Sequence, residues 1–473
     1  MADLKVTTTS GENCVLAGNA IDQFKPSLRG DILSSTDNGY DAARKVWNGM
    51  IDKRPALIVR CSGVADVISA VRFARDHDLL VSVRGGGHNV AGSAVCDGGL
   101  VIDLSLMKGV HVDPIRRTAR AQPGATLGDL DHETQAFGFA VPAGIVTTTG
   151  IAGLTLGGGF GWLNRKYGLT CDNLLSADVV TSEGQMLKAS PEENADLFWG
   201  LRGGGGNFGI VTSFEYQMHA VGPTVLAGLI VYPMAKAPEV LQFYRDFVAD
   251  IPYELTAVPA LRLAPPAPFL PEEVHGKPII AVFVCYCGPV EEGERALRPL
   301  RGFGTPLADV IQPKPFIMHQ SMLDPMQPAG RNYYWKSDDL LELTDPAIDT
   351  IVAHSEAITS PHTIVPLFQF GGVGSKVAED ATAYSHRNAA YALNCNASWT
   401  EGEPERHIQW ARDFSSAMQP YSNGVYMNFL GDEGEERTKA AYGAAKFDRL
   451  VSLKNKYDPT NFFRINQNIK PTV

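Results

Sequence analysis

The sequence predicts an α+β protein made of three consecutive segments. In the first third of the chain, short apolar stretches alternate with stretches of helical spacing and with glycine-rich turns. From about Gly222 proline becomes frequent, and long apolar strands alternate with helices. The last segment is short and carries several asparagines. The length of 473 residues is enough for about two or three domains, and we expect boundaries after residues 221 and 424.

The elements of the first segment follow from the spacing of their apolar residues. Val67, Ala70, Val71 and Ala74 fall on one face of a helix predicted over 64–76. Thr126 is a suitable N-cap for a helix that continues to about 137. Strands are predicted over 55–61, 79–83, 100–104, 118–121, 176–181 and 208–216.

The later elements are predicted in the same way. A helix is expected over 238–249 and another over 442–457, followed by a tail, 458–468, that returns to line a site. The apolar stretch Ile279–Cys287 is about half of the ~20 residues that a membrane helix requires. Its β-branched and aromatic residues are typical of a buried strand.

Composition excludes several classes of protein. The chain has 41 basic and 52 acidic residues, a net charge of −11, which argues against a nucleic-acid-binding protein. The N-terminus has no basic head followed by a long apolar run, and no membrane segment is predicted. The 7 cysteines include no C-x-x-C pair, so we expect free thiols, no metal site and a cytoplasmic protein.

The first glycine motif is Arg84-Gly85-Gly86-Gly87-His88-Asn89, directly after an apolar strand. Three successive glycines let backbone N–H groups approach a diphosphate closely and allow positive φ angles. The motif is neither a Walker A sequence nor G-x-G-x-x-G opening a helix. Taken alone, it is equally consistent with a glycine-rich turn.

Two further glycine-rich segments support the interpretation of the first motif as part of a binding site. Residues 142–161 contain glycines at 150, 153, 157, 158, 159 and 161, a density that favours neither an ordinary helix nor a strand. Residues 199–211 carry another glycine run before a strand. A large flat ligand packed on bare backbone would offset the conformational entropy that these glycines lose. Together the three segments predict a long dinucleotide-binding groove.

These three segments, with Tyr167–Asn173 and the tail 461–468, resemble the berberine bridge enzyme-like flavoproteins of the vanillyl alcohol oxidase superfamily. The resemblance extends over nearly the whole chain. It implies a PCMH-type FAD-binding domain formed by residues 1–221 and completed by the C-terminal segment 425–473. Residues 222–424 would form a substrate domain with a large antiparallel sheet backed by helices.

The resemblance implies how the FAD is held. His88 occupies the position of the histidine that is bonded covalently to the flavin 8-methyl group; the alternative is a neutral histidine that caps a turn. Many relatives have a second link from a cysteine where this chain has Val146, and Cys171 is no obvious substitute. We therefore expect a single link. Thr149 stands where relatives control oxygen access, and its small side chain favours an oxidase.

The remaining cofactor-binding residues are also carried over from the resemblance. Asn428, Asn466 and Asn468, with Tyr426, would face the flavin edge, although such residues also cap ordinary turns. The complete expected set is Arg84, Gly85, Gly86, Gly87, His88, Asn89, Val146, Thr149, Gly150, Gly153, Leu154, Gly159, Asn173, Gly206, Val211, Asn428, Asn466 and Asn468.

The implied chemistry is hydride transfer from a substrate C–H next to oxygen or nitrogen to the flavin, with O2 as the final acceptor. The catalytic base is left open. Plant relatives have a tyrosine where this chain has Phe429, and Asn394 stands where others have a glutamate or glutamine. We expect these two residues at the substrate. The candidates for the base are Tyr426, Tyr384 and His386, although His386 and Arg387 could equally form a structural pair.

Three functions remain open from the sequence. The first is an FAD-linked oxidase of a small alcohol, sugar or amine that uses O2. The second keeps the flavin but reacts poorly with O2, as in a dehydrogenase or an oxidative-cyclisation enzyme. The third is a non-catalytic protein that binds a nucleotide or a glycan.

Overall fold

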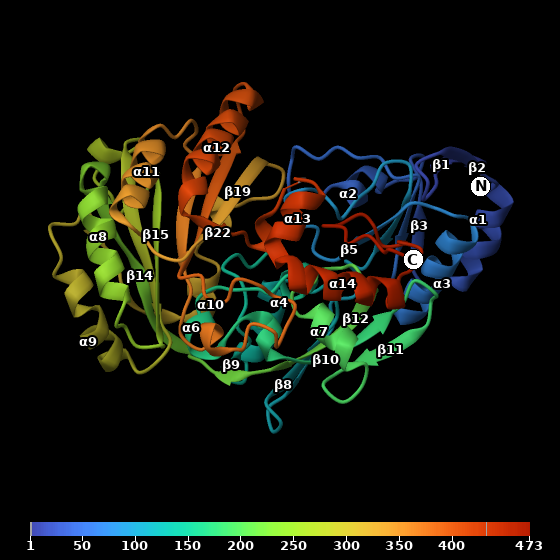
Figure 1. The fold of residues 1–473 in the computed structure, drawn as a ribbon, viewed down its shortest axis with the longest axis horizontal. Coiled ribbons are helices and arrows are strands. Elements are labelled where there is room, and N and C mark those ends of the chain that lie inside the picture. Colours follow the sequence, from blue (N-terminus) through green and yellow to red (C-terminus); the bar gives the residue numbers. More distant parts are fainter. Residues whose placement is uncertain (1, 432) are drawn as a thin grey trace.

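The computed structural model describes residues 2–431 and 433–473, arranged as in Figure 1. Its N-terminal part contains a four-stranded sheet with the order β3 (Asp31–Leu33), β4 (Leu57–Arg60), β6 (Leu100–Asp103), β5 (Val81–Arg84). Strands β4 and β5 both pair in parallel with β6. Beside this sheet, the four residues predicted on the apolar face of the helix over 64–76 are buried in α3 (Val64–Asp76). Because β5 ends at Arg84, the first glycine motif begins at the end of a strand.

A second sheet of five antiparallel strands carries the other two glycine segments. Its order is β11 (Met186–Ala189), β10 (Leu174–Val180), β12 (Ile210–Gln217), β8 (Thr118–Ala121), β7 (Val110–Asp113). Helix α4 (Leu127–Gln135) begins after Thr126, whose hydroxyl accepts a hydrogen bond from the Asp129 N–H at 3.3 Å. The Asp129 carboxylate in turn accepts from the Thr126 N–H at 2.8 Å, a capping box that confirms the predicted N-cap.

The glycine-dense second segment, 142–161, contains a short helix, contrary to the expectation from its composition. This helix is α5 (Ile151–Leu156), and another short helix, α6 (Asn164–Tyr167), follows the segment. Only Gly153 lies inside α5, and the run of glycines begins at Gly157, where this helix ends. The glycines therefore terminate the helix instead of preventing it. Helix α7 (Ala195–Leu201) precedes the third glycine segment.

The middle of the chain forms a large antiparallel sheet, which confirms the predicted architecture. The strand order is β17 (Ala308–Asp309), β14 (Thr224–Pro233), β16 (Pro278–Tyr286), β15 (Leu255–Leu263), β20 (Ile364–Gln369), β21 (Tyr391–Trp399), β19 (Asn332–Leu340), β22 (Ser422–Gly424), and β18 (Gln312–Pro315) also pairs with β14. The apolar stretch from Ile279 lies in β16, as expected for a buried strand.

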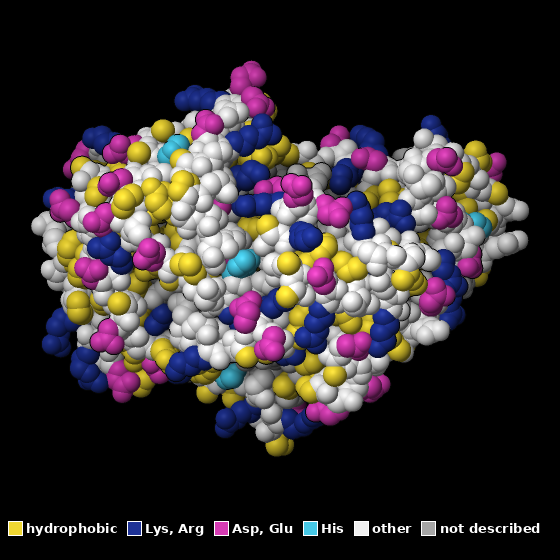
Figure 2. Space-filling model, in the orientation of Figure 1, with side chains coloured by type: hydrophobic (Ala, Val, Ile, Leu, Met, Phe, Trp, Pro, Cys, Tyr) yellow, Lys and Arg dark blue, Asp and Glu magenta, His cyan; other side chains and the backbone are white. Residues whose placement is uncertain are grey.

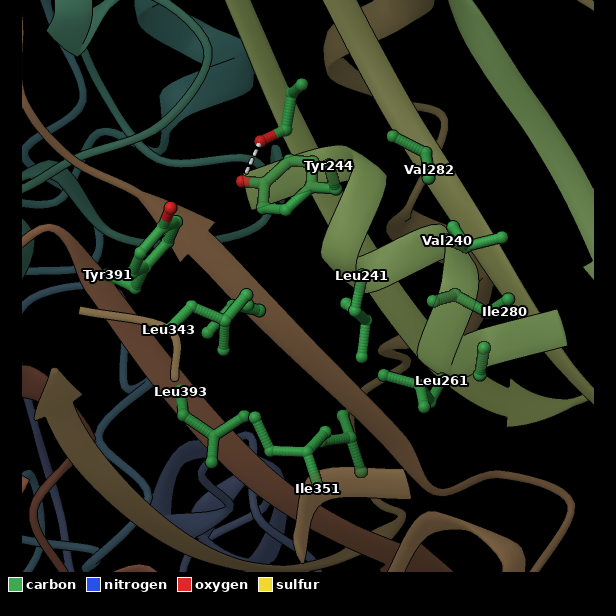
Figure 3. Packing of buried hydrophobic residues seen from close by; sticks show 14 of the residues in the cluster. Val240, Leu241, Tyr244, Leu261, Ile280, Val282, Leu343, Ile351, Tyr391 and Leu393 are labelled. Atoms are coloured by element: carbon green, nitrogen blue, oxygen red, sulfur yellow. Dashed lines mark hydrogen bonds between the residues drawn. The ribbon is translucent and has the colours of Figure 1, made fainter. Parts of the chain in front are cut away.

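One face of this sheet packs against helices, as Figure 3 shows. Successive side chains of a strand point to opposite faces of the sheet. Leu261, Ile280 and Leu393 point to the face that the helices cover and pack among the helix side chains. The Tyr244 hydroxyl of α8 donates a hydrogen bond to the Ala257 carbonyl at 2.9 Å. The helices are α8 (Ala237–Val248), α9 (Val290–Arg301), α11 (Asp345–Glu356) and α12 (Pro404–Met418).

The C-terminal segment returns to the half of the molecule that contains the two N-terminal sheets (Figure 1). The helix predicted over 442–457 begins at Ala444 as α14 (Ala444–Tyr457), and α13 (Glu435–Tyr442) precedes it. Gly443 separates the two, with a φ of +73° that glycine adopts readily. The buried Lys454 ammonium donates to the carbonyls of Asn207 and Phe463, both at 2.9 Å, and fastens the tail to the third glycine segment.

The fold is α+β, with the helix-backed sheet at one end of the molecule and the smaller sheets at the other (Figure 1). Acidic and basic side chains are mixed over the face drawn in Figure 2. Within residues 2–431 and 433–473, no helix has the length and apolar character to cross a membrane. Shorter elements are β1 (Leu4–Thr7), β2 (Asn13–Leu16), α1 (Gly18–Phe24), α2 (Tyr40–Arg44), β9 (Phe139–Ala140), β13 (His219–Ala220) and α10 (Phe316–Gln320).

Candidate functional site

A pocket of about 350 Å³ lies between the glycine segments and the face of the large sheet opposite the helices. This volume is typical of small-molecule and cofactor sites. Fourteen of the expected cofactor-binding residues line it: Gly85, Gly86, Gly87, His88, Asn89, Val146, Thr149, Gly150, Gly153, Leu154, Gly206, Val211, Asn428 and Asn466. Tyr426 and both expected substrate-side residues, Asn394 and Phe429, line it as well.

Some glycines of the pocket are required by close backbone packing. A Cβ on Gly86 would lie 2.5 Å from the Cα of Gly150, so the first two glycine segments meet only because both positions lack side chains. Gly87 has a φ of +68°, in the left-handed region that glycine tolerates. The sequence motifs, separated by some sixty positions in the chain (84–89 and 142–161), therefore form one continuous backbone surface.

Other glycines leave space for a ligand. A Cβ on Gly153 or on Gly206 would meet no protein atom within 4 Å, and both residues line the pocket. A side chain at either position would occupy the volume of the pocket. By contrast, a Cβ on Gly157 would lie 2.1 Å from Asn428 Oδ1, so that glycine is required by packing between protein groups. Some of these glycines therefore leave space for a ligand, and others are required by packing within the protein.

His88 presents a buried ring nitrogen without a partner. Its Nε2 atom is buried and forms no hydrogen bond with the protein. Burial lowers the pKa of His88 to about 4, although a hydrogen bond to its own backbone opposes the shift. The imidazole is therefore neutral near pH 7, and a neutral ring keeps one nitrogen lone pair free for bonding.

The ring of His88 is held by an aromatic stack that the sequence analysis missed. Trp47 stacks on His88 with ring centroids 4.2 Å apart and an angle of 21° between the planes. The other neighbour of Trp47 is Tyr333 of β19, at 3.7 Å and 15°. The Trp47 indole N–H donates to the Gln327 carbonyl at 3.0 Å. This stack connects the first glycine motif to the large sheet.

The C-terminal tail completes the far end of the pocket, as expected. Asn207 donates from Nδ2 to the Gln467 carbonyl at 3.2 Å, and its Oδ1 accepts from the Ile469 N–H at 3.0 Å. Asn466 donates to the Gly206 carbonyl at 3.1 Å. Its own Oδ1 is buried without a partner. The tail therefore lies directly against the third glycine segment.

Tyr426 lies at the junction between the glycine segments and the sheet. Its hydroxyl oxygen accepts hydrogen bonds from the Gly159 N–H at 3.0 Å and from Asn428 Nδ2 at 2.8 Å. Burial raises the pKa of Tyr426, while these two donors oppose the rise. Both contacts use the acceptor capacity of the oxygen, so the O–H proton remains available to another group.

Six expected site residues do not line the pocket. Two of them are the base candidates Tyr384 and His386: His386 has a φ of +60°, and strand β21 begins only at Tyr391. His386 Nε2 lies 3.3 Å from the Ala440 carbonyl. The Tyr384 ring packs against the position where Gly158 would carry a Cβ. The structure therefore separates both side chains from the pocket, and Tyr426 is the base candidate that remains in it.

The other four have structural contacts. Arg84 donates to the Ala43 carbonyl, and Gly159 donates its N–H to Tyr426 and packs on Thr170. Asn173 donates to the carbonyls of 167 and 169, at 2.9 and 2.8 Å, and so caps its own turn. These two hydrogen bonds give Asn173 a structural role that requires no contact with a ligand. Asn468 is half-buried and does not line the pocket, and its buried Oδ1 atom has no hydrogen-bond partner.

The sheet side of the pocket contains residues that the sequence analysis did not name. Asn396 lies two positions after Asn394 on β21, hence on the same face, and Trp335 is its partner across the β19–β21 pair. Gln327 and Phe160 also line the pocket. Strand alternation from Asn394 could have indicated Asn396. The sequence could not indicate Trp335 and Gln327, because strand pairing and loop placement bring these residues to the pocket.

The pocket combines a glycine-lined backbone channel, a buried neutral imidazole and an uncharged sheet face. These features define an enzyme that binds a large planar dinucleotide cofactor along the backbone and a small molecule against the sheet. The open space beside Gly153 and Gly206 and the free Nε2 of His88 fit such a cofactor.

Comparisons with known proteins identify the class more closely. Residues 55–190 match the family described as FAD binding domain, and residues 425–470 match the family described as berberine and berberine like. An FAD-linked oxidoreductase from Dictyostelium discoideum is 32% identical over 96% of this chain and 98% of its own. The structure of 6-hydroxy-D-nicotine oxidase from Arthrobacter nicotinovorans superimposes with a TM-score of 0.84 at 30% identity, covering 94% of this chain and 98% of that one. Chitooligosaccharide oxidase gives a TM-score of 0.83 at 25% identity, covering 96% and 100%.

The chain belongs to the berberine bridge enzyme-like family of FAD-linked oxidoreductases. The resemblance, the fold class and the FAD cofactor expected from the sequence are thereby confirmed. A purely non-catalytic nucleotide- or glycan-binding role is set aside.

Proposed function

We propose that this protein is an FAD-linked oxidase that oxidises a small alcohol, sugar or amine and passes the electrons to O2. When bound, the flavin supplies the hydride acceptor for a substrate C–H next to oxygen or nitrogen. The observation that carries the proposal is the buried, unpartnered Nε2 of His88 within the glycine-lined pocket. Relatives named as oxidases of an amine and of a sugar are consistent with it.

We propose that FAD is attached through a single bond to His88. The neutral imidazole provides the nucleophile, and Val146, which also lines the pocket, has no group that could form a second bond. Cys171 lies outside the pocket lining, and burial raises the pKa of its thiol, so it is a poor nucleophile.

The chain would contribute the remaining parts of the reaction. Bare backbone at Gly153 and Gly206 would carry the cofactor, and Thr149 would leave room for O2. Tyr426, whose oxygen already accepts from Asn428 and Gly159, would donate its O–H to the substrate and orient it. Asn394 and Phe429 would contact the substrate. We also propose residues 1–221 and 425–473 as the two parts of the FAD domain, and 222–424 as the substrate domain.

The attachment is tested with denatured protein. In the wild type the yellow cofactor should stay with the polypeptide after acid precipitation, and His88→Ala should release it. Mass spectrometry of tryptic flavopeptides should find flavin only on the peptide that contains position 88. Flavin that stays bound in His88→Ala would place the bond elsewhere. As a companion variant, Val146→Cys should create a second link that joins two peptides.

The oxidase activity is tested separately. A peroxide-release screen over sugars, secondary alcohols, phenols and cyclic amines should identify a substrate. Stopped-flow mixing of the reduced enzyme with air-saturated buffer should then show rapid reoxidation. Slow reoxidation would contradict the oxidase and favour a dehydrogenase or an oxidative-cyclisation enzyme.

A further inference from the structure

An aromatic wall lines the pocket where the second glycine segment meets the sheet; its members are Phe160, Phe368, Trp335, Tyr426 and Phe429. Phe160 is the centre of this wall: its ring centroid lies 5.1 Å from that of Phe368, 4.6 Å from that of Tyr426 and 5.7 Å from that of Phe429. Trp335 meets Phe429 edge-on at 5.4 Å. Such rings bind flat apolar bodies by stacking and edge contacts.

The lining of the pocket is uncharged among the described residues, because none of those that line it is lysine, arginine, aspartate or glutamate. An ionic substrate would lose its hydration there without gaining a counter-ion, which costs several kcal/mol. The pocket therefore favours substrates that are neutral when they bind. An amine would have to bind in its unprotonated form.

Among the described residues, six that line the pocket have a buried polar atom without a partner in the protein. Three of these atoms are His88 Nε2, Trp162 Nε1 and Asn466 Oδ1. The other three are Trp335 Nε1, a donor, and two acceptors, Asn396 Oδ1 and Gln327 Oε1. Asn396 is 4% exposed and Gln327 is 9% exposed. Trp335 and Asn396 are directly paired in the β19–β21 register, so donor and acceptor belong to one place on the sheet.

Buried polar groups without partners are costly, and a ligand that pairs with them recovers that cost. From these observations we infer that the substrate is a neutral compound with a flat apolar body and one head group that both donates and accepts hydrogen bonds, such as a hydroxyl or a secondary amide. This inference rests on the proposed function, because it describes the substrate of that same site. Trp335 Nε1 donates to the oxygen of the head, and either Asn396 or Gln327 accepts from its single O–H or N–H.

The same features disfavour a polyhydroxylated sugar. Every hydroxyl of a buried sugar needs a partner, and the wall formed by Phe160, Phe368 and Phe429 provides none. A single donor–acceptor head needs only one donor and one acceptor, which Trp335 Nε1 and Asn396 Oδ1 supply. The specificity-determining residues are therefore Trp335, Asn396 and Gln327.

The inference is tested by calorimetric titration of the holoenzyme at pH 7 with four probes. They are 4-methylphenol, 4-methylanisole, 4-methylbenzoate and methyl α-glucoside. We expect 4-methylphenol to bind at least tenfold more tightly than 4-methylanisole, which has the acceptor but no donor. The benzoate anion and the glucoside should not bind measurably. Tighter binding of the glucoside or the benzoate than of 4-methylphenol would overturn the inference.

Two variants separate the roles of donor and acceptor. Asn396→Leu should weaken the binding of 4-methylphenol about tenfold and leave the binding of 4-methylanisole unchanged. Trp335→Phe should weaken the binding of both probes, because both present an oxygen to the indole N–H. Asn332→Leu, the same change on β19 outside the pocket, is the matched control. A preference for 4-methylphenol that survives in Asn396→Leu would contradict the assigned role. If that variant fails to fold, the probe series on the wild type still decides.

These titrations do not depend on turnover. If peroxide release or the histidyl link fails while the probe order holds, the proposed function is wrong and the substrate class stands. If a sugar is oxidised and the glucoside binds best, the substrate class is wrong and the oxidase stands.

Discussion

At the scale of single residues, environment decides which of several similar side chains faces the pocket. Tyr426 and Tyr384 are both buried phenols, with ring centroids 6.2 Å apart. Only Tyr426 lines the pocket, and its oxygen is held by Gly159 and Asn428. Residue type and spacing made both candidates for the base, but backbone conformation after Tyr384 turns that segment away.

A first prediction concerns these two tyrosines. Tyr426→Phe removes the acceptor for Asn428 and the O–H that would orient the substrate, so kcat should fall about 100-fold, a loss typical of a misplaced substrate. Tyr384→Phe serves as the matched control and should change kcat less than twofold. Steady-state peroxide release with the substrate found by the screen measures both. Equal losses in the two variants would argue against a specific role for Tyr426.

A second prediction concerns Trp47. Because its ring stacks on His88 and is itself held by Tyr333, Trp47→Leu should let the imidazole rotate and lower the fraction of covalently bound flavin at least fivefold. Trp47→Phe keeps an aromatic ring and should retain most of the link. In-gel fluorescence of the denatured polypeptide measures the fraction directly. Full attachment in Trp47→Leu would show that the stack does not position His88.

At the scale of elements, α4 and α10 meet through a buried polar contact. Gln320 of α10 donates from Nε2 to Asp131 of α4 at 3.1 Å and to the Gly144 carbonyl at 3.0 Å. Burial raises the pKa of Asp131 to about 7, well above the value near 4 of an unfolded chain. The contact joins a helix that packs beside the second sheet to a helix beside the large sheet.

This pKa gives a prediction for stability against pH. A carboxyl whose pKa is raised on folding favours the protonated state, so its contribution is intact below about pH 4 and is lost as pH rises through about 7. Between pH 5 and pH 8 the Tm of Asp131→Asn should therefore fall less than that of the wild type, by at least about 2 °C. Thermal unfolding at both pH values measures this, with Asp349→Asn on exposed α11 as the control. Parallel curves for Asp131→Asn and wild type would refute the raised pKa.

At the scale of the whole molecule, the pocket exists only because distant parts of the chain meet. The tail is attached by the buried pair of Lys454 and Asp458, 2.7 Å apart, with both side chains 0% exposed. The Asp458 carboxylate also accepts the N–H groups of Phe462 and Phe463 at 2.8 and 2.9 Å. Every group of this cluster is satisfied, so removal of one partner leaves a buried charge.

A last prediction follows from this attachment. Lys454→Met should lower the free energy of unfolding by about 3–5 kcal/mol, the usual cost of breaking a buried ion pair. The exposed pair of Lys456 with Asp196 provides the control, and Lys456→Met should cost about 1 kcal/mol or less. Denaturant titration measures both variants. In a His88→Ala background, Lys454→Met should also weaken FAD retention, because it loosens the chain beside Asn207.

Much of the fold could be predicted from local pattern. The bounds of α3, the N-cap at Thr126 and the buried strand from Ile279 depend on spacing within a few residues, and the structure has them as expected. The errors have local causes too. One glycine, Gly443, divides the helix predicted over 442–457, and the glycine run after α5 ends a helix that composition alone did not suggest.

The sequence by itself determined the backbone of the site: where side chains are absent, where a strand ends in a glycine run, and that a histidine follows directly. Those properties depend only on consecutive residues and on the side-chain periodicity of strands and helices. Only the tertiary structure decided that Trp47 stacks on His88, that Trp335 and Asn396 form one side of the pocket, and that Tyr384 and His386 do not. The reason is physical: these contacts join residues that lie tens of positions apart in the chain, and packing of whole sheets and helices, not local preference, brings them together.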